Sequence, residues 1–554
     1  MTGLRAAEDR PTPKEVYNWR LYTEALIIST GSFLFGYDSA FIGTTIARPS
    51  FKQDFGILPE HASEISSNIT SAFQAGAFFG AIFCFFFTEW LGRKWTLQLN
   101  VFVFIIGAIL MVVTPNELSY IYAGRVLTGV GCGAVTATVP SYIAELSISS
   151  IRGILTGLFE LAYQTGSLIG FWINFGINQN MATTSAASWR LPMGFQLVPA
   201  VPLLIGGFFI HESPLWLMRK GKEDKATKAL VELRKLPADH EYIQEEMVML
   251  KARLEEEATI ASGYGQGAYA LFRGAMHEFS QKGMRIRVLV ITCAFTLQNL
   301  SGAAAINYYS PTLFGSLGVT DVALYTGIYG LVKAIASIIY YVGLIDLVGR
   351  RRPVIISSLA CSVCLWIVGT YVKIGHPADA IAAGQELSAS TAAGGRMAIG
   401  MIMIYSVFWS FGLNGVPWIL AAELFGGALR NFSGTYAALV QWAIQFAITK
   451  ALPYIFTSFG YGTWFFFACW MLVATIWAYF LVPETKGLTV DQMDLIFGYQ
   501  NDRPYEIPHT SLTNRIIRDG QLERERERED AKLGGVGSEQ KAAHAHTESR
   551  EESV

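Results

Sequence analysis

The sequence predicts an all-α polytopic membrane protein with about twelve transmembrane helices, arranged in two pseudo-symmetric six-helix halves. Three observations lead to this fold class. First, 52% of the 554 residues are hydrophobic and only 16% are charged, whereas soluble domains carry about 25% charged residues. Second, the apolar residues fall in long runs. Third, short charged motifs occur twice, in the same order, along the chain.

The apolar runs match the thickness of a bilayer, because a hydrocarbon core of about 30 Å needs roughly 20 residues of helix. Six runs lie in the first part of the chain, at 25–46, 69–88, 96–114, 119–142, 153–177 and 191–210. Six more follow, at 287–314, 322–345, 353–373, 397–422, 432–457 and 462–482. A charged segment separates the two sets. We therefore expect six spans, a break and six spans.

Lysine and arginine gather in alternate loops, and such loops are typical of the cytoplasmic side. Both termini are therefore predicted to be cytoplasmic. The expected organisation is a cytoplasmic N-terminal segment (1–20), the first half (21–211), a cytoplasmic helical loop (212–286), the second half (287–483) and a cytoplasmic tail (484–554). Within the loop, residues 223–236 and 242–257 have the periodicity of amphipathic helices. The tail is expected to be mostly disordered, since it is rich in charge.

Composition argues against several classes of function. The net charge is −2 and no basic stripe is present, so a nucleic-acid partner is not expected. All six cysteines lie in apolar runs and none pairs with histidine at metal-ligand spacing, so neither a disulfide framework nor a zinc site is indicated. No nucleophile–base pair or nucleotide loop is found, so we expect neither an enzyme nor a cofactor.

The repeated motifs consist of acids and bases at the predicted cytoplasmic ends of the helices. They are Glu89 and Arg93, matched by Asp346 and Arg350; Glu145 and Arg152, matched by Glu423 and Arg430; and Glu212, matched by Glu484. Guanidinium and carboxylate groups form strong charge-assisted pairs. We predict that these ten residues form a gate, which holds the cytoplasmic ends of the halves together and opens when the halves move. The alternative is that they reflect membrane topology alone.

Ionisable residues inside a span are costly and are functional candidates by default. Asp38 lies roughly 20 Å from the cytoplasmic end of the first span, and Arg125 lies roughly 10 Å from the outer end of the fourth, at 1.5 Å per residue. In a core of about 30 Å these depths coincide. We therefore predict an Asp38–Arg125 pair that couples transport to proton binding, because burial and a nearby cation act oppositely on a carboxyl. A static ion pair is the alternative.

Glu160 and Lys333 are further charged residues in the spans and are candidates to line a central cavity. Lys333 lies roughly 16 Å into the eighth span. A permanent pair with a neighbouring carboxylate is the alternative for Lys333. Lys450 lies near the outer end of the eleventh span, where it is expected to extend its amine to the membrane surface.

The chain from about residue 17 to residue 497 resembles the sugar porter family of the major facilitator superfamily. The resemblance rests on Gly-Arg-Lys at 92–94, the glycine-rich run 124–133, Gln298 to Gly302, Tyr308-Tyr309-Ser310, Pro417-Trp418 and the run Pro483 to Gly487. Residues 8–20 and 36–45 are similar to the fungal quinate-permease branch of this family, which also includes carriers of hexuronic acids.

The resemblance implies the major facilitator fold, alternating access and a solute site between the halves. The expected solute-binding residues are Glu160, Gln164, Gln298, Asn299, Tyr309, Lys333, Trp418 and Gln441. Several positions depart from the pattern of hexose carriers. Glu160 replaces a glutamine, Asn299 replaces a second glutamine and Ala304 replaces an asparagine. These differences disfavour a plain glucose substrate and leave the fold and the transport role unchanged.

Three functions are compatible with the sequence. The first is proton-coupled import of a sugar acid or cyclitol acid, such as galacturonate or quinate. The second is hexose transport, either proton-coupled or facilitative. The third is a nutrient sensor that binds solute without transport, which retention of Asp38, Arg125 and both motif sets disfavours. The expected partners are a small polyhydroxylated solute, a proton and the lipid bilayer, and we expect a monomer in the plasma membrane.

Overall fold

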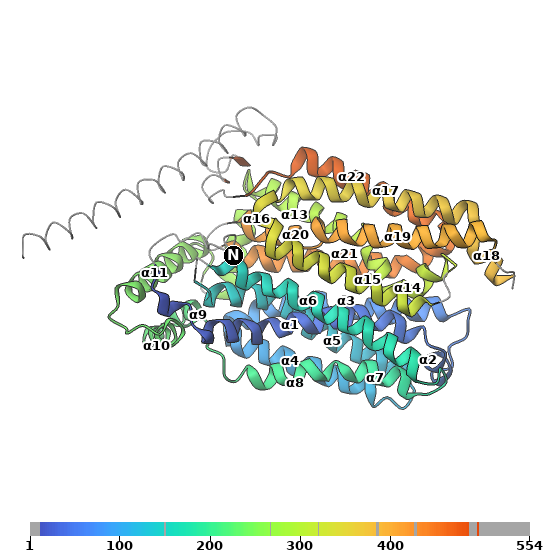
Figure 1. Ribbon diagram of the computed structural model, residues 1–554. Coiled ribbons are helices and arrows are strands. Elements are labelled where there is room, and N and C mark those ends of the chain that lie inside the picture. The colour runs from blue at the N-terminus through green and yellow to red at the C-terminus, as the bar shows by residue number, and fades with distance from the viewer. Residues whose placement is uncertain are drawn as a thin grey trace, which may run out of the picture.

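The computed structural model describes residues 12–148, 151–265, 267–318, 321–383, 387–425, 429–486, 493 and 496–497. Long helices run side by side in two groups, one formed by the first half of the chain and one by the second (Figure 1). A smaller group of helices lies at one end of this bundle. Most of the segment predicted as a disordered tail, from residue 487 on, lies outside the described residues.

The first half contains one helix or helix pair for each of its six predicted spans. Its helices are α1 (Trp19–Ile46), α2 (Pro49–Asp54), α3 (Ala62–Leu91), α4 (Arg93–Val112), α5 (Leu118–Leu146), α6 (Arg152–Asn180), α7 (Ala187–Phe195) and α8 (Leu197–Gly206). Helix α1 begins after Asn18, whose side chain accepts a hydrogen bond from the Arg20 amide at 3.0 Å. This contact caps an otherwise unpaired N–H group at the helix start.

The segment between the halves is helical, as its periodicity predicted. It forms α9 (Pro214–Arg219), α10 (Glu223–Arg234), α11 (Glu241–Ala261) and α12 (Ala268–Phe279). Helices α9, α10 and α11 lie beyond the end of the first half in Figure 1. Arg93 and Arg350 lie at this same end of the bundle, which is called the basic end below.

The second half repeats the architecture of the first. It comprises α13 (Met284–Asn299), α14 (Ala303–Gly315), α15 (Val322–Ile339), η3 (Tyr340–Leu344), α16 (Ile345–Val348), α17 (Arg351–Gly375), α18 (Pro377–Ala382), α19 (Ala389–Phe411), α20 (Val416–Glu423), α21 (Leu429–Phe459) and α22 (Gly462–Leu481). Nine described helical segments are long and apolar enough to cross a membrane by length and composition. The remaining three predicted spans correspond to α6, the α7–α8 pair and α21.

The two halves meet mainly through four pairs of helices, α3 with α21, α6 with α15, α5 with α21, and α1 with α14. The last contact depends on a glycine. A Cβ atom at Gly43 of α1 would lie 2.1 Å from the carbonyl oxygen of Tyr308 in α14, far inside van der Waals contact. The backbones of the two halves therefore touch directly, and no larger residue fits at Gly43 in this conformation.

Two spans that the sequence predicted as continuous are broken. The first break separates α13 from α14 at Gly302, whose φ of +92° favours glycine, and the second separates α19 from α20 at residues 412–415. Polar backbone groups inside a membrane must find partners within the protein. Side chains of each broken span bind the backbone of the other, since Gln298 donates to the Leu413 carbonyl at 2.9 Å and the Tyr405 hydroxyl donates to the Ser301 carbonyl at 3.0 Å.

Candidate functional site

Asp38 of α1 and Arg125 of α5 form a fully buried ion pair within the first half. The Oδ1 atom of Asp38 lies 2.5 Å from Nη1 of Arg125, and both side chains are 0% exposed. The guanidinium also lies over the Phe73 ring, with 4.5 Å between its carbon and the ring centroid. Among the described residues, Asp38 Oδ2 and Arg125 Nη2 have no hydrogen-bond partner. The pair therefore holds one unused acceptor and one unused donor in a dry environment.

Glu160 of α6 makes a polar contact across the interface between the halves. Its Oε1 atom accepts hydrogen bonds from Gln164 Nε2 at 2.6 Å and from Asn414 Nδ2 at 2.7 Å. Asn414 lies in the break between α19 and α20 and also donates to the Ser337 hydroxyl of α15 at 3.4 Å. The structure thus brings together Glu160 and Gln164, both predicted from sequence, with an asparagine that the sequence analysis missed.

Lys333 of α15 lies next to this contact and is completely buried. Its amine sits between two aromatic rings, 5.4 Å from the centroid of Tyr163 and 5.5 Å from that of Trp409. Among the described residues, its Nζ atom has no hydrogen-bond partner. The permanent pair with a neighbouring carboxylate, considered from sequence, is therefore not formed within 4.0 Å in this conformation.

A chain of amides extends from this region along the second half. Asn299 of α13 donates to Gln441 of α21 at 2.7 Å, Gln441 donates to Gln445 at 3.1 Å, and Gln445 donates to the Tyr308 hydroxyl at 3.0 Å. Gln298, Asn299 and Gln441 were predicted from sequence, and Gln445 and Tyr308 were not. The side chains of Asn299, Gln441, Gln445 and Tyr308 bind one another here, so a solute that uses them must replace these hydrogen bonds.

The two aromatic residues predicted to bind solute lie in different contacts. The Trp418 ring packs against Phe295, with centroids 4.9 Å apart. The Tyr309 hydroxyl instead contacts the Thr70 hydroxyl of α3 at 3.3 Å, toward the end of the bundle opposite the basic end. Lys450 also lies there, and its amine donates to Asn68 of α3 instead of extending freely to the surface. Tyr309 and Lys450 therefore join the two halves.

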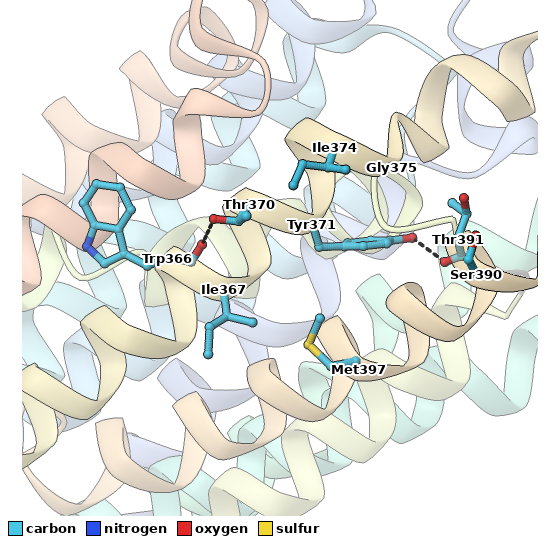
Figure 2. A pocket seen from close by; sticks show the side chains of 9 residues that line it. All are labelled: Trp366, Ile367, Thr370, Tyr371, Ile374, Gly375, Ser390, Thr391 and Met397. Atoms are coloured by element: carbon cyan, nitrogen blue, oxygen red, sulfur yellow. Dashed lines mark hydrogen bonds between the residues drawn. The ribbon is translucent and has the colours of Figure 1, made fainter.

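A large cavity on the flank of the bundle does not coincide with these residues. It has a volume of 580 Å³ and lies between α17 and α19 (Figure 2). Its lining includes Trp366, Ile374 and Met397, whose side chains are partly exposed. No residue predicted to bind solute lines it. Within the described parts of the chain, no group of three or more His, Cys, Asp or Glu side chains is placed to hold a metal ion.

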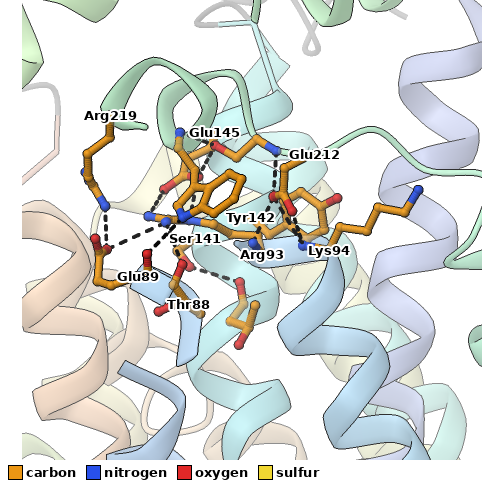
Figure 3. A network of polar contacts seen from close by, with 12 residues as sticks. Thr88, Glu89, Arg93, Lys94, Ser141, Tyr142, Glu145, Glu212 and Arg219 are labelled. Atoms are coloured by element: carbon orange, nitrogen blue, oxygen red, sulfur yellow. Dashed lines mark hydrogen bonds and ion pairs between the residues drawn. The ribbon is translucent and has the colours of Figure 1, made fainter. Parts of the chain in front are cut away.

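The repeated motif of the first half forms a compact network at the basic end (Figure 3). Arg93 pairs with Glu145 at 2.9 Å and with Glu89 at 3.6 Å. The Glu212 carboxylate accepts hydrogen bonds from the Arg93 amide at 2.8 Å and from the Lys94 amide at 3.2 Å. The negative charge of Glu212 is also stabilised by the partial positive charge at the N-terminus of α4.

The second half repeats this network. Arg350 pairs with Glu423 at 2.9 Å, and the Glu484 carboxylate accepts hydrogen bonds from the Arg350 amide at 2.8 Å and from the Arg351 amide at 3.3 Å. Both turns contain a glycine with positive φ, Gly92 at +94° and Gly349 at +89°. A Cβ at either glycine would lie within 2.5 Å of the capping carboxylate. The duplication seen in sequence is therefore also a duplication of contacts.

The described contacts of these motifs lie within each half, and the gating role of the ten residues stays a prediction. Each ion pair given above connects residues of the same half, and Glu212 and Glu484 cap helices of their own half. Glu89 also binds Arg219 of α9, which attaches the loop helices to the first half. The side chains of Asp346 and Arg430 lie outside the described residues, and Arg152 makes contacts of its own. The network thus fixes each half at the basic end.

His211 forms a further contact at the basic end, and the repeated motifs gave no indication of it. Its Nδ1 atom lies 2.6 Å from Glu24 of α1 and its Nε2 atom lies 2.8 Å from Glu232 of α10. The hydrogen bond to Glu24 is the main cause that raises the pKa of His211, with Glu232 acting in the same direction and burial opposing both. A protonated His211 therefore joins α1 to the loop helices.

Two six-helix halves, broken helices at their interface and buried charges on both sides of it define a secondary transporter of the major facilitator class. The chain belongs to the sugar transporter family, because residues 24–497 match the family model described as "Sugar (and other) transporter". It is therefore a multi-pass membrane transporter and not an enzyme.

Curated relatives and solved structures agree with this assignment. A probable quinate permease of Aspergillus clavatus is 42% identical over 505 residues, which cover 90% of this chain and 91% of the relative. The quinate permease of Emericella nidulans is 40% identical over 93% of this chain and 95% of its own. The fold matches the proton:xylose symporter XylE bound to 6-bromo-6-deoxy-D-glucose, with a TM-score of 0.69, 22% identity, and coverage of 86% of this chain and 99% of that structure.

Proposed function

We propose that the protein imports a small polyhydroxylated acid, quinate or a hexuronate such as galacturonate, together with a proton. The basic end faces the cytoplasm in this proposal, and the protein acts as a monomer in the plasma membrane. The quinate permeases, 40–42% identical over most of the chain, support the cyclitol acid as a substrate class. Alternating exposure of the interface between the halves would carry the substrate across.

The buried amine of Lys333 is the observation that carries the choice of an acid. An unpaired carboxylate is expensive to remove from water, so a site for an acid must offer it a cation or a strong set of donors. Lys333 is 0% exposed and its Nζ atom lacks a hydrogen-bond partner among the described residues. Its position between Tyr163 and Trp409 leaves it available to a ligand that enters between the halves.

The ion pair of Asp38 and Arg125 supports coupling to protons. Asp38 Oδ2 is buried without a hydrogen bond, so it can take up a proton without losing an existing contact. When Asp38 is neutral, its attraction to Arg125 weakens. The two side chains can then be either paired or separated, and a transport cycle can alternate between these two states. A solved protein of the same fold is described as a proton:xylose symporter, which supports the same assignment.

The experiment is uptake of labelled quinate, galacturonate and glucose by cells that lack their own carriers. We expect uptake of an acid that a protonophore abolishes. In Lys333→Gln, acid uptake should fall far more than any residual hexose uptake, whereas Lys222→Gln, at an exposed lysine before α10, should change neither. Preferential transport of glucose by the unmutated protein would contradict the proposal and favour the hexose carrier. Equal losses for both substrates in Lys333→Gln would make Lys333 structural.

A further inference from the structure

The interface between the halves contains a second buried acid, Glu160, beside the unpartnered cation. The contacts of Tyr163 and of Asn414 place the two groups close together. Tyr163, whose ring faces the Lys333 amine, follows Glu160 by three residues on α6, and residues three apart lie on the same face of a helix. Asn414 binds both Glu160 and Ser337, which lies one turn beyond Lys333 on α15. The charge of Glu160 acts on Lys333.

Among the residues that the structure describes, Glu160 has hydrogen-bond donors but no cation within 4.0 Å. Its Oε1 atom accepts from the amides of Gln164 and Asn414, and the other groups nearby are the hydroxyls of Tyr163 and Tyr341. Tyr341 Oη has no hydrogen-bond partner among the described residues. An ionised Glu160 and a charged Lys333 therefore balance each other in a dry site, without the contact that would fix them as a closed ion pair.

This balance changes when an acid binds. One ammonium and two carboxylates, those of Glu160 and the substrate, leave an excess negative charge where burial of unpaired charge is most costly. A proton on Glu160 removes the excess, and the Lys333 ammonium is then free to pair with the substrate. We propose that Glu160 is a substrate-linked proton site, which takes up a proton when an anionic substrate binds beside Lys333. The inference rests on the proposed acid substrate.

The step moves a single proton and changes no other bond. The proton comes from the aqueous phase on the side from which the substrate enters, and it converts the Glu160 carboxylate to a carboxylic acid. Oε1 can remain the carbonyl acceptor of Gln164 and Asn414, and the hydroxyl on Oε2 becomes a donor. When the substrate leaves on the other side, Glu160 releases the proton there. A neutral sugar would bring no charge and would require no proton at Glu160.

The experiment is calorimetric titration of quinate into the purified protein, near neutral pH, in two buffers with different ionisation enthalpies. The difference between the two binding enthalpies gives the number of protons taken up per quinate. We expect proton uptake in the unmutated protein and fewer protons taken up for each quinate that Glu160→Gln binds. The control Glu241→Gln, at an exposed residue at the start of α11, should leave the proton number unchanged.

A second measurement does not depend on how well the variant folds. The infrared difference spectrum of the unmutated protein should show a protonated carboxyl band on addition of quinate. No such band, or an unchanged proton number in Glu160→Gln, would overturn this inference and leave an acid carrier in place. Failure of the unmutated protein to bind either quinate or galacturonate would overturn the proposed function, and this inference with it.

Discussion

Asp38 and Arg125 lie in a part of the molecule that water does not reach, so the cost of separating their charges is high. Removing one partner of a buried ion pair costs about 3–5 kcal/mol, because the other charge stays buried and unpaired. Sequence reasoning found this pair because it required only the depth of each residue, and depth follows from a rise of 1.5 Å per residue.

Replacement of Asp38 by asparagine tests proton coupling. Asparagine keeps the size of the side chain and an oxygen acceptor for Arg125, but it cannot take up a proton. We expect Asp38→Asn to lose uphill accumulation of substrate and to retain exchange with pre-loaded substrate. Uptake with and without a protonophore measures this. The exposed Asp379→Asn is the matched control, and accumulation by Asp38→Asn against a gradient would show that Asp38 is not the coupling residue.

Other residues of the candidate site could not be located by depth. Tyr309 and Trp418 were both expected at the solute site, but the rotation of each helix places them in separate contacts. Asn414 lies in the segment Gly412–Gly415, where two glycines interrupt an apolar span. Such an interruption indicates a broken helix, and broken helices carry the binding sites of many transporters. Lys333 was recognised as a buried charge, but its lack of a partner is visible only once the neighbouring side chains are placed.

Helix α10 is attached to α1 through His211, and this attachment depends on pH. The pKa of His211 is raised above its ordinary value of 6.5 by its hydrogen bonds to Glu24 and Glu232. The stabilisation is therefore complete below pH 6.5 and is lost as the pH rises through the raised pKa. His211 in turn lowers the pKa of Glu232. The contact between His211 and Glu232 is therefore also lost in strong acid, which protonates Glu232.

Thermal unfolding of His211→Gln measures this dependence. We expect the variant to unfold at a lower temperature than the unmutated protein at about pH 6, and the difference to shrink toward about pH 9, where His211 is neutral. His277→Gln is the control, because His277 is an exposed histidine in the same group of loop helices. A difference that is the same at both pH values would show that protonation of His211 does not contribute.

The two copies of the motif network differ in burial, so equal substitutions should have unequal effects. The side chain of Glu145 is 2% exposed, whereas that of Glu423 is 28% exposed. Loss of a buried carboxylate costs up to about 3–5 kcal/mol, while an exposed pair contributes about 0–1 kcal/mol. We expect Glu145→Gln to destabilise the protein more than Glu423→Gln, and both to slow transport. Thermal unfolding and initial uptake rates at matched membrane abundance measure the two effects.

Normal turnover in both variants would leave these residues with a role in topology alone. A larger loss of stability in Glu423→Gln would contradict the argument from burial. Sequence reasoning identified the members of this network and their repetition, but not which carboxylate each arginine binds. Which of several nearby carboxylates an arginine binds depends on the packing of α3, α4 and α5, which spacing along the chain does not determine.

On the scale of the whole molecule, the halves are closed against each other at the end opposite the basic end. Gly43 makes this closure possible, since a Cβ there would meet the Tyr308 carbonyl oxygen. We expect Gly43→Leu to prevent the closure and to stop transport while the protein remains folded. Gly176→Leu is the matched control, because a Cβ at Gly176 of α6 would have no neighbouring atom within 4 Å.

Reagent access reports the closure directly. A cysteine introduced at Asn68, which contacts Lys450 across the interface, should react faster with a maleimide in Gly43→Leu than in the unmutated background, with the native cysteines measured in parallel. Equal reaction rates, or normal transport by Gly43→Leu, would show that this contact does not close the pathway.

The twelve spans themselves followed from hydropathy, because the thickness of the bilayer sets the length of each run.

The capped glycine turn at residues 92–94 and its copy at residues 349–351 bear on how such a chain arose. Each turn is closed by a carboxylate from its own half, so a six-helix chain with a single copy would already be complete at the basic end. Two such chains could pack as a homodimer with two-fold symmetry. Fusion of the duplicated gene through a linker would then allow the two copies to diverge in sequence. Specialisation of the copies, with Asp38 and Arg125 in one and Lys333 in the other, would then add the asymmetry needed to bind one unsymmetrical solute.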